Sequence, residues 1–70
     1  MLTKDYFDKH FKLHNKLVLF SKDNIPITIT KEYHFAANGG HRSFTLQDSE
    51  DLADFCRDFN LSIQPHENIH

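Results

Sequence analysis

The sequence predicts a small α+β protein in which a three-stranded antiparallel β-meander carries two α-helices on one face, in the order αβββα. Three observations predict this class. Apolar residues recur at helical spacing near both ends of the chain, and they alternate with polar residues in the middle. Asn38-Gly39-Gly40 then gives a strong hairpin signal between two alternating segments. With 70 residues the chain has room for a single small domain, residues 1–70, of which about 65–70 should form a frayed tail.

Both helices have a start signal and an apolar stripe. The first is expected from Thr3, which can cap it, to about Asn15. Its stripe consists of Tyr6, Phe7, His10, Phe11 and His14. The second begins at Asp48-Ser49, and Asn60 is a suitable left-handed residue to end it. Its stripe consists of Leu52, Phe55, Cys56 and Phe59. These spacings predict helices with one buried face each.

Three segments between the helices have the composition of strands. The first is Leu17 to Phe20, which ends in a polar turn. The second runs over residues 25–35 as one long bent strand or as two pieces joined by a bulge, because its alternation is interrupted at Lys31. The third runs from Ser43 to Gln47, and Leu61-Ser62-Ile63 is expected to add a short edge strand.

The pairing of the strands decides which side chains are buried. A two-residue loop at the Asn38–Gly40 hairpin would place Phe35 opposite Phe44 and Tyr33 opposite Leu46. The same parity in the first hairpin gives an expected core face of Val18, Phe20, Ile25, Ile27, Ile29, Tyr33, Phe35, Phe44 and Leu46. Leu17 and Leu19 are then left on the opposite, open face, together with His34.

Charge is unevenly distributed along a chain whose net charge is −2. Residues 1–22 hold five lysines against Asp5 and Asp8, a net of +3. Residues 43–70 hold six acids against Arg57, a net of −5. The protein should therefore present two surfaces of opposite sign. No apolar run reaches about 18 residues, which excludes a membrane-spanning helix. A single cysteine, Cys56, favours a reducing cytoplasm.

The sequence predicts no catalytic, cofactor-binding or metal-binding residues, and hence no enzyme. Cys56 lies on the buried stripe of the second helix, where burial would raise its pKa and leave it a packing residue. The pairs His10/His14 and His66/His70 have ligand spacing, but each supplies only two ligands. No nucleophilic serine turn or phosphate-binding glycine loop accompanies them.

Two surfaces are candidates for contact with a partner protein. The first is the carboxylate row Glu50, Asp51, Asp54 and Asp58, which would dock on a basic surface. The second is the Leu17/Leu19 face with His34, which could equally form a homodimer contact. The leading hypothesis is therefore a small protein-binding module. The alternative is a nucleic-acid-binding regulator that uses Lys4, Lys9, Lys12 and Lys16, although Asp5 and Asp8 offset these charges and disfavour nucleic acid as a partner.

The stretch from His34 to Phe59 combines a strand, an Asn-Gly turn, a second strand and the helix start Asp-Ser-Glu-Asp-Leu. It resembles the middle of some small phage-encoded anti-CRISPR proteins with αβββα meanders. The resemblance implies a compact, non-enzymatic inhibitor that binds a host protein complex in the host cytoplasm. It transfers no functional residue, because the matching positions are turn, cap and core residues.

Overall fold

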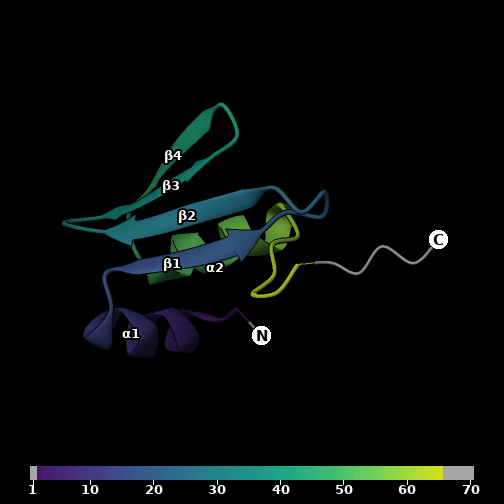
Figure 1. The fold of residues 1–70 in the computed structure, drawn as a ribbon. Coiled ribbons are helices and arrows are strands. Elements are labelled where there is room, and N and C mark those ends of the chain that lie inside the picture. Colours follow the sequence, from purple (N-terminus) through teal and green to yellow (C-terminus); the bar gives the residue numbers. More distant parts are fainter. Residues whose placement is uncertain (1, 66–70) are drawn as a thin grey trace.

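The computed structural model describes residues 2–65, which form two helices and four strands. In chain order these are α1 (Lys4–Leu13), β1 (Lys16–Phe20), β2 (Pro26–Lys31), β3 (Phe35–Gly39), β4 (Arg42–Leu46) and α2 (Ser49–Asp58) (Figure 1). The strands pair antiparallel in the order β1-β2-β3-β4. The α+β class and the arrangement of strands between two helices are confirmed, whereas the predicted number of three strands is wrong.

The fourth strand arises from a turn within residues 25–35. The chain reverses at residues 32–34, where the Glu32 N–H donates to the His34 carbonyl at 3.0 Å, and Lys31 pairs with Phe35. The single bent strand of the prediction is therefore two antiparallel strands. Polar Lys31-Glu32 breaks the alternation, and both side chains are exposed at this point. Tyr33 is 99% exposed at the tip of the turn, and its predicted place in the core is wrong.

The register of the first hairpin is the reverse of the predicted one. Leu17 opposes Ile29 and Leu19 opposes Ile27, so both leucines face the core, while Val18 and Phe20 point to the other side of the sheet. The loop that connects the strands has an odd number of residues, 21–25, and this changes the parity of the pairing. The Ser21 hydroxyl holds the loop by accepting hydrogen bonds from the N–H groups of residues 23 and 25, and the residue between them, Asn24, has φ 62°.

The second hairpin keeps the predicted parity but is shifted by two residues. Gly39 pairs with Arg42 across a two-residue loop, in which Gly40 has φ 60°. Phe35 therefore faces Leu46, and Phe44 faces Ala37 rather than Phe35. A shift by two residues leaves every side chain on its face, because side chains alternate with a period of two. Phe35, Phe44 and Leu46 therefore stay on the predicted core face despite the error.

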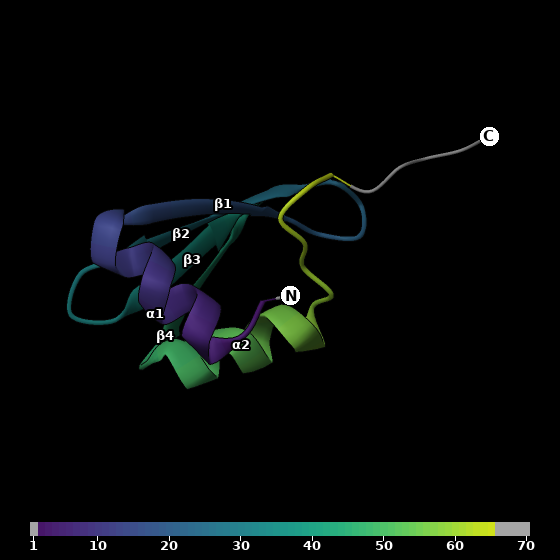
Figure 2. The ribbon, with the colours of Figure 1, turned by 90° about the horizontal axis from the view of Figure 1, so that it is seen from below.

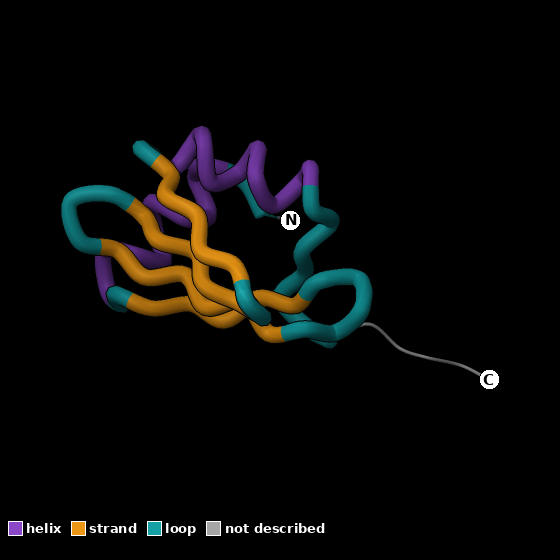
Figure 3. The backbone as a smooth tube through the Cα atoms, turned by 90° about the horizontal axis from the view of Figure 1, so that it is seen from above, coloured by secondary structure: helices purple, strands orange, loops and turns teal. Residues whose placement is uncertain are grey.

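Both helices cover the same face of the sheet, as Figures 2 and 3 show from opposite directions. One core joins the two layers. It consists of Phe7, Phe11, Leu19, Ile29, Phe35, Ala37, Leu52, Phe55 and Cys56. The rings of Phe11 in α1 and Phe35 in β3 meet edge to face with centroids 5.1 Å apart. The predicted helix-covered face is confirmed, although β1 contributes different residues to it.

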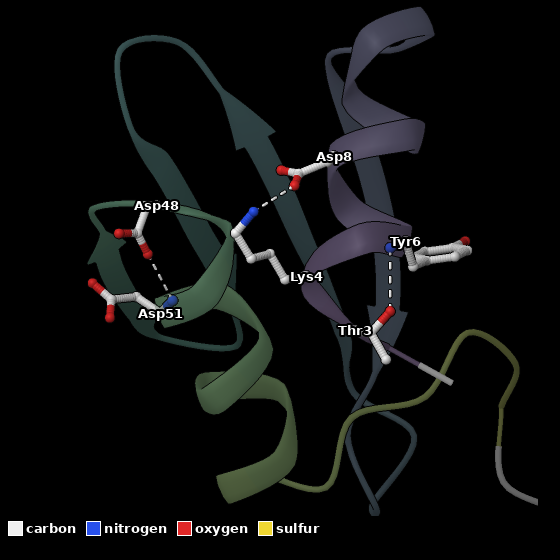
Figure 4. A network of polar contacts seen from close by, with 6 residues as sticks. All are labelled: Thr3, Lys4, Tyr6, Asp8, Asp48 and Asp51. Atoms are coloured by element: carbon white, nitrogen blue, oxygen red, sulfur yellow. Dashed lines mark hydrogen bonds and ion pairs between the residues drawn. The ribbon is translucent and has the colours of Figure 1, made fainter.

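The helix starts predicted from the sequence are also confirmed. The Thr3 hydroxyl accepts a hydrogen bond from the Tyr6 N–H at 3.2 Å, and Asp48 accepts one from the Asp51 N–H at 2.9 Å (Figure 4). Each bond satisfies a backbone donor that the helix itself leaves unpaired. After α2, Asn60 takes the left-handed conformation with φ 54° and turns the chain back toward the sheet.

The segment after α2 touches the edge of the sheet at one residue. Phe20 and Ser62 exchange two backbone hydrogen bonds, of 2.8 and 2.9 Å. The predicted short edge strand is thus reduced to a single bridge, and most of the predicted tail, residues 66–70, lies outside the described residues. Neither helix within residues 2–65 combines the length and the apolar character needed to cross a bilayer.

Candidate protein-binding surface

The four carboxylates predicted from the sequence, Glu50, Asp51, Asp54 and Asp58, are all exposed on α2 and are called the acidic row below. Asp54 forms an ion pair with Arg57 at 3.0 Å, in which both side chains are more than half exposed. Within residues 2–65, no cation lies at ion-pair distance from the other three carboxylates. The row therefore keeps most of its charge available for an external partner.

Asp8 of α1 takes part in two polar contacts, one within its own helix and one to the start of α2. Within α1, Lys4 Nζ lies 2.9 Å from Asp8 Oδ2 (Figure 4). Hydrogen bonds from Lys4 and from Ser49 of α2 hold the pKa of Asp8 below its ordinary value. The same bond to Asp8, with a smaller contribution from Glu50, raises the pKa of Lys4. The hydrogen bond from Ser49 thus joins the first turn of α2 to α1.

An aromatic cluster borders the acidic row on the side of β4. It consists of Phe44, Phe55 and Phe59, whose ring centroids lie 4.7 to 5.6 Å apart. Phe55 is buried, whereas Phe59 is 47% exposed because α2 ends one residue before it. Residues three and four positions from Phe55, namely Asp58 and Asp51, lie on the same flank of the helix. Figure 4 shows Asp51 on the side of α2 turned away from α1.

The second predicted surface does not exist in the form expected. Leu19 is fully buried and Leu17 packs against the core, because the register of β1 turns both toward the helices. His34 is exposed, but it lies in the turn at residues 32–34 rather than beside the leucines on a sheet face. The open face instead carries Val18 and Phe20 of β1, together with Thr28, Thr30, Ser43 and Thr45 of the other strands. The predicted placement of Leu17 and Leu19 on that face is wrong.

The lysines proposed for a nucleic-acid surface do not share one surface. Lys4 is engaged with Asp8 at the first turn of α1. Lys16 pairs with Thr30 at the start of β1, so its side chain lies on the open face of the sheet, while α1 packs on the opposite face. Lys9 and Lys12 remain as exposed lysines of α1 itself. This separation weakens the nucleic-acid alternative.

The histidines and the cysteine have identifiable structural roles. His10 Nε2 lies 2.9 Å from the Lys16 carbonyl, and the rings of His10 and His14 have centroids 4.9 Å apart. Within residues 2–65, no three side chains of the metal-ligating types gather at one point, and the pair His66/His70 lies outside that range. Cys56 is 2% exposed, and burial raises its pKa to about 12, as predicted.

The sequence does not predict the exposure of Phe59. This residue continues the apolar stripe of α2 by spacing, which predicts a place in the core with Leu52 and Phe55, whereas it is 47% exposed. The signal lay in Asn60, because a helix that ends there leaves Phe59 at its frayed terminus. The exposure of the four carboxylates on α2 is confirmed, since charge and helical spacing together determine it, and their role in binding stays a prediction.

Comparisons with known proteins add no homologue to this description. No family model matches the chain, and no curated protein and no solved structure matches it significantly.

Proposed function

We propose that this chain is a small, non-catalytic protein-binding module that docks through the acidic row of α2 on a basic surface of a partner protein. The observation that carries the proposal is that three of the four carboxylates in the acidic row have no ion-pair partner among residues 2–65. These three are Glu50, Asp51 and Asp58, and all of them are exposed. Three unpaired like charges on one short helix attract a basic surface and speed its association.

The aromatic cluster gives this surface an apolar centre. Half-exposed Phe59 and partly buried Phe44 pack against Phe55. Asp51 and Asp58 lie one turn to either side of Phe55 on α2. Protein interfaces combine an aromatic anchor with a charged rim, since the anchor supplies burial and the rim supplies orientation. The resemblance of residues 34–59 to small anti-CRISPR proteins supplies a candidate class of partner. On that basis we propose a host protein complex as the target and inhibition as the outcome.

The test compares two triple variants that change the net charge equally. One neutralises the acidic row with Glu50→Gln, Asp51→Asn and Asp58→Asn. The control neutralises exposed acids elsewhere with Asp5→Asn, Asp23→Asn and Glu32→Gln. The control loses one first-turn acid, Asp5 of α1, whereas the acidic-row variant loses two, Glu50 and Asp51 of α2, so circular dichroism must show that both variants remain folded.

Each protein is used as bait in affinity capture from the native host, followed by mass spectrometry at about 0.15 M and 0.5 M salt. At the lower salt we expect the wild type and the control to capture the same partner protein. The acidic-row variant should fail to capture it. Raising the salt should release it, because exposed charges are screened beyond about 8 Å at physiological ionic strength. Equal capture by both variants, or no captured protein in any arm, contradicts the proposal.

A further inference from the structure

The two edges of the sheet differ in how far they are paired. At the β1 edge, Phe20 is bonded to Ser62, and the Lys16 carbonyl lies 2.9 Å from His10 Nε2. At the β4 edge, no backbone hydrogen bond from within residues 2–65 reaches Ser43 or Thr45 from outside the sheet. An unpaired edge strand is a template for the addition of another strand. The fold therefore covers part of one edge and leaves the other open.

The register identifies which groups of β4 are available. In an antiparallel ladder, every second residue directs its N–H and C=O toward the same neighbouring strand. Gly39 and Arg42 close the two-residue hairpin loop, so Arg42, Phe44 and Leu46 bond to β3. Ser43 and Thr45 then direct their backbone groups outward. Both residues are exposed, and the Ser43 hydroxyl bonds back to Asn38 Oδ1 at 2.7 Å, which leaves the edge clear.

The surroundings of this edge define the chemistry of a strand that would fit it. On the helix-covered side, an added strand would contact Phe44 and the half-exposed Phe59. Asp51 and Asp58 lie one turn to either side of Phe55, the α2 residue whose ring contacts Phe44, and their seven-residue separation spans about 10 Å of helix. Two basic residues four positions apart in a strand are about 13 Å apart and lie on one face, so flexible side chains could reach both carboxylates.

The same charges argue against a second copy of this chain as the occupant. The acids beside the β4 edge are Asp48, Asp51 and Asp58, and Arg42 is the one base in the strand. Symmetric pairing of two β4 strands would bring two such negatively charged edges together. Like charges at an interface oppose association, whereas a basic strand neutralises them.

We propose that β4 is an acceptor for an extended partner segment that adds as a fifth strand. On its helix-facing side, this segment carries an apolar residue between two lysines or arginines. Main-chain hydrogen bonds to Ser43 and Thr45 provide the pairing, while Phe44, Phe59, Asp51 and Asp58 select the side chains. This inference rests on the proposed function, because it specifies how a basic partner engages the surface beside α2.

The probe is the synthetic peptide acetyl-TKTLTKT-amide, titrated into the full chain to millimolar concentration and followed by NMR. Its matched control is N-methylated at the two central threonines, the positions that would pair with Ser43 and Thr45. A second control, TETLTET, reverses the charge. We expect slowed amide exchange at Ser43 and Thr45 with the first peptide, and about tenfold weaker binding of the N-methylated peptide, which has lost two donors. TETLTET should not bind.

Two protein variants test the same main-chain hydrogen bonds from the side of β4. Thr45→Pro removes an outward N–H without removing a bond to β3, and Thr45→Val keeps that N–H. We expect the proline variant to lose about tenfold in affinity and the valine variant to bind as the wild type. Should Thr45→Pro unfold, the exchange rates of the wild-type amides decide the question. Equal binding of the N-methylated peptide, or shift changes away from β4, overturns strand addition.

The outcomes separate this inference from the proposed function. Basic peptides that bind irrespective of N-methylation contradict strand addition and leave docking on the acidic row intact. A partner captured equally without the acidic row contradicts the proposed function itself. Protection of Ser43 and Thr45 that grows with protein concentration in the absence of peptide, together with a dimer in sedimentation, identifies a second copy as the occupant and overturns the proposal.

Discussion

Gly39 of β3 and Pro26 of β2 approach so closely that a side chain has no room between them. A Cβ atom built on Gly39 would lie 2.8 Å from the Pro26 carbonyl oxygen, and it would also overlap the side chain of Ile27. Because one of these neighbours is backbone, it cannot move aside by rotation about a side-chain bond. The glycine is therefore required by the packing of two strands, in contrast to Gly40 in the turn, which has φ 60°.

Gly39→Ala should lower the free energy of unfolding by about 1–3 kcal/mol, the usual cost of forcing an added methyl into a packed site. Urea denaturation monitored by circular dichroism measures it. Gly40→Ala is the contrasting variant, since its Cβ would meet no atom closer than 4.0 Å and its cost, about 1–2 kcal/mol, comes from the left-handed backbone.

Further substitutions distinguish the two glycines, because a different change should restore the stability lost at each. Gly40→Asn should recover much of the stability lost in Gly40→Ala, because asparagine tolerates the left-handed region. Ile27→Ala should reduce the incremental cost of Gly39→Ala only in part, because the Pro26 carbonyl remains. An unchanged unfolding free energy for Gly39→Ala would contradict the close approach.

The two hairpins show which parts of the fold a sequence can predict. Asn38-Gly39-Gly40 gave the correct parity for β3 and β4, because a glycine-rich tight turn restricts the loop to two residues. Residues 21–25 contain no such restriction, and the loop length was set by hydrogen bonds to the Ser21 hydroxyl. One residue of difference exchanged the two faces of β1. Composition alone could not decide it, since Leu17, Leu19, Val18 and Phe20 are all apolar.

The bridge between Phe20 and Ser62 provides a test of how the segment after α2 contributes to stability. Ser62→Pro removes the N–H that donates to the Phe20 carbonyl at 2.9 Å. We expect a loss of about 1–2 kcal/mol, the cost of one backbone hydrogen bond and of a carbonyl left without its partner. Chemical denaturation measures the loss, and amide exchange at Phe20 reports whether the reciprocal bond also weakens.

Ser62→Ala is the matched control. It keeps both backbone bonds and removes only the hydroxyl, which donates to the Gln64 carbonyl at 2.6 Å. This variant should stay within about 0.5 kcal/mol of the wild type, as surface substitutions usually do. Equal stability of the proline and alanine variants would show that the bridge is dispensable.

Asp8 should make stability depend on acidic pH. Hydrogen bonds from Lys4 and Ser49 hold its folded-state pKa below the ordinary 3.8. The unfolded state therefore takes up a proton first as the pH falls, and the carboxylate's contribution is present above pH 3.8 and lost below it. We expect Asp8→Asn to be less stable than the wild type at pH 7, with the difference vanishing near pH 2. Urea midpoints between pH 2 and 7 measure this convergence.

Asp5→Asn is the control, because Asp5 is an exposed acid of the same helix and the structure gives it no ion pair within residues 2–65. At pH 7 it should lose less stability than Asp8→Asn, because within the described part of the chain it removes no side-chain hydrogen bond. A stability loss of Asp8→Asn that stays constant down to pH 2 would show that Lys4 and Ser49 do not hold the Asp8 carboxylate.

The candidate site was predictable where it depended on one element and unpredictable where it depended on several. The acidic row follows from spacing within a single helix, and it was found. The β4 edge and the half-exposed Phe59 depend on strand order and on the residue at which α2 ends. These are tertiary properties, and a hydrophobic pattern does not contain them. For the same reason the sequence predicts a surface patch at Leu17 and Leu19, whereas Leu19 is buried and Leu17 packs against the core.

Cys56 should make stability depend on alkaline pH. Burial raises the pKa of its thiol from 9.0 to about 12, so above pH 9 the unfolded chain loses this proton while the folded chain keeps it. The stability contributed by the neutral thiol is complete below pH 9 and declines as the pH rises toward 12, by up to about 1.4 kcal/mol per pH unit. Cys56→Ala leaves a small cavity but has no thiol to titrate. The stability advantage of the wild type over Cys56→Ala should therefore shrink from pH 9 upward, as measured by urea denaturation between pH 7 and 10.5. Comparing the two proteins cancels the contributions of the lysines and tyrosines, which are the same in both.

Native Cys56 should also react with iodoacetamide far more slowly than the urea-unfolded chain at pH 8. A constant stability difference across this range, or rapid native alkylation, would place the thiol at the surface rather than in the core.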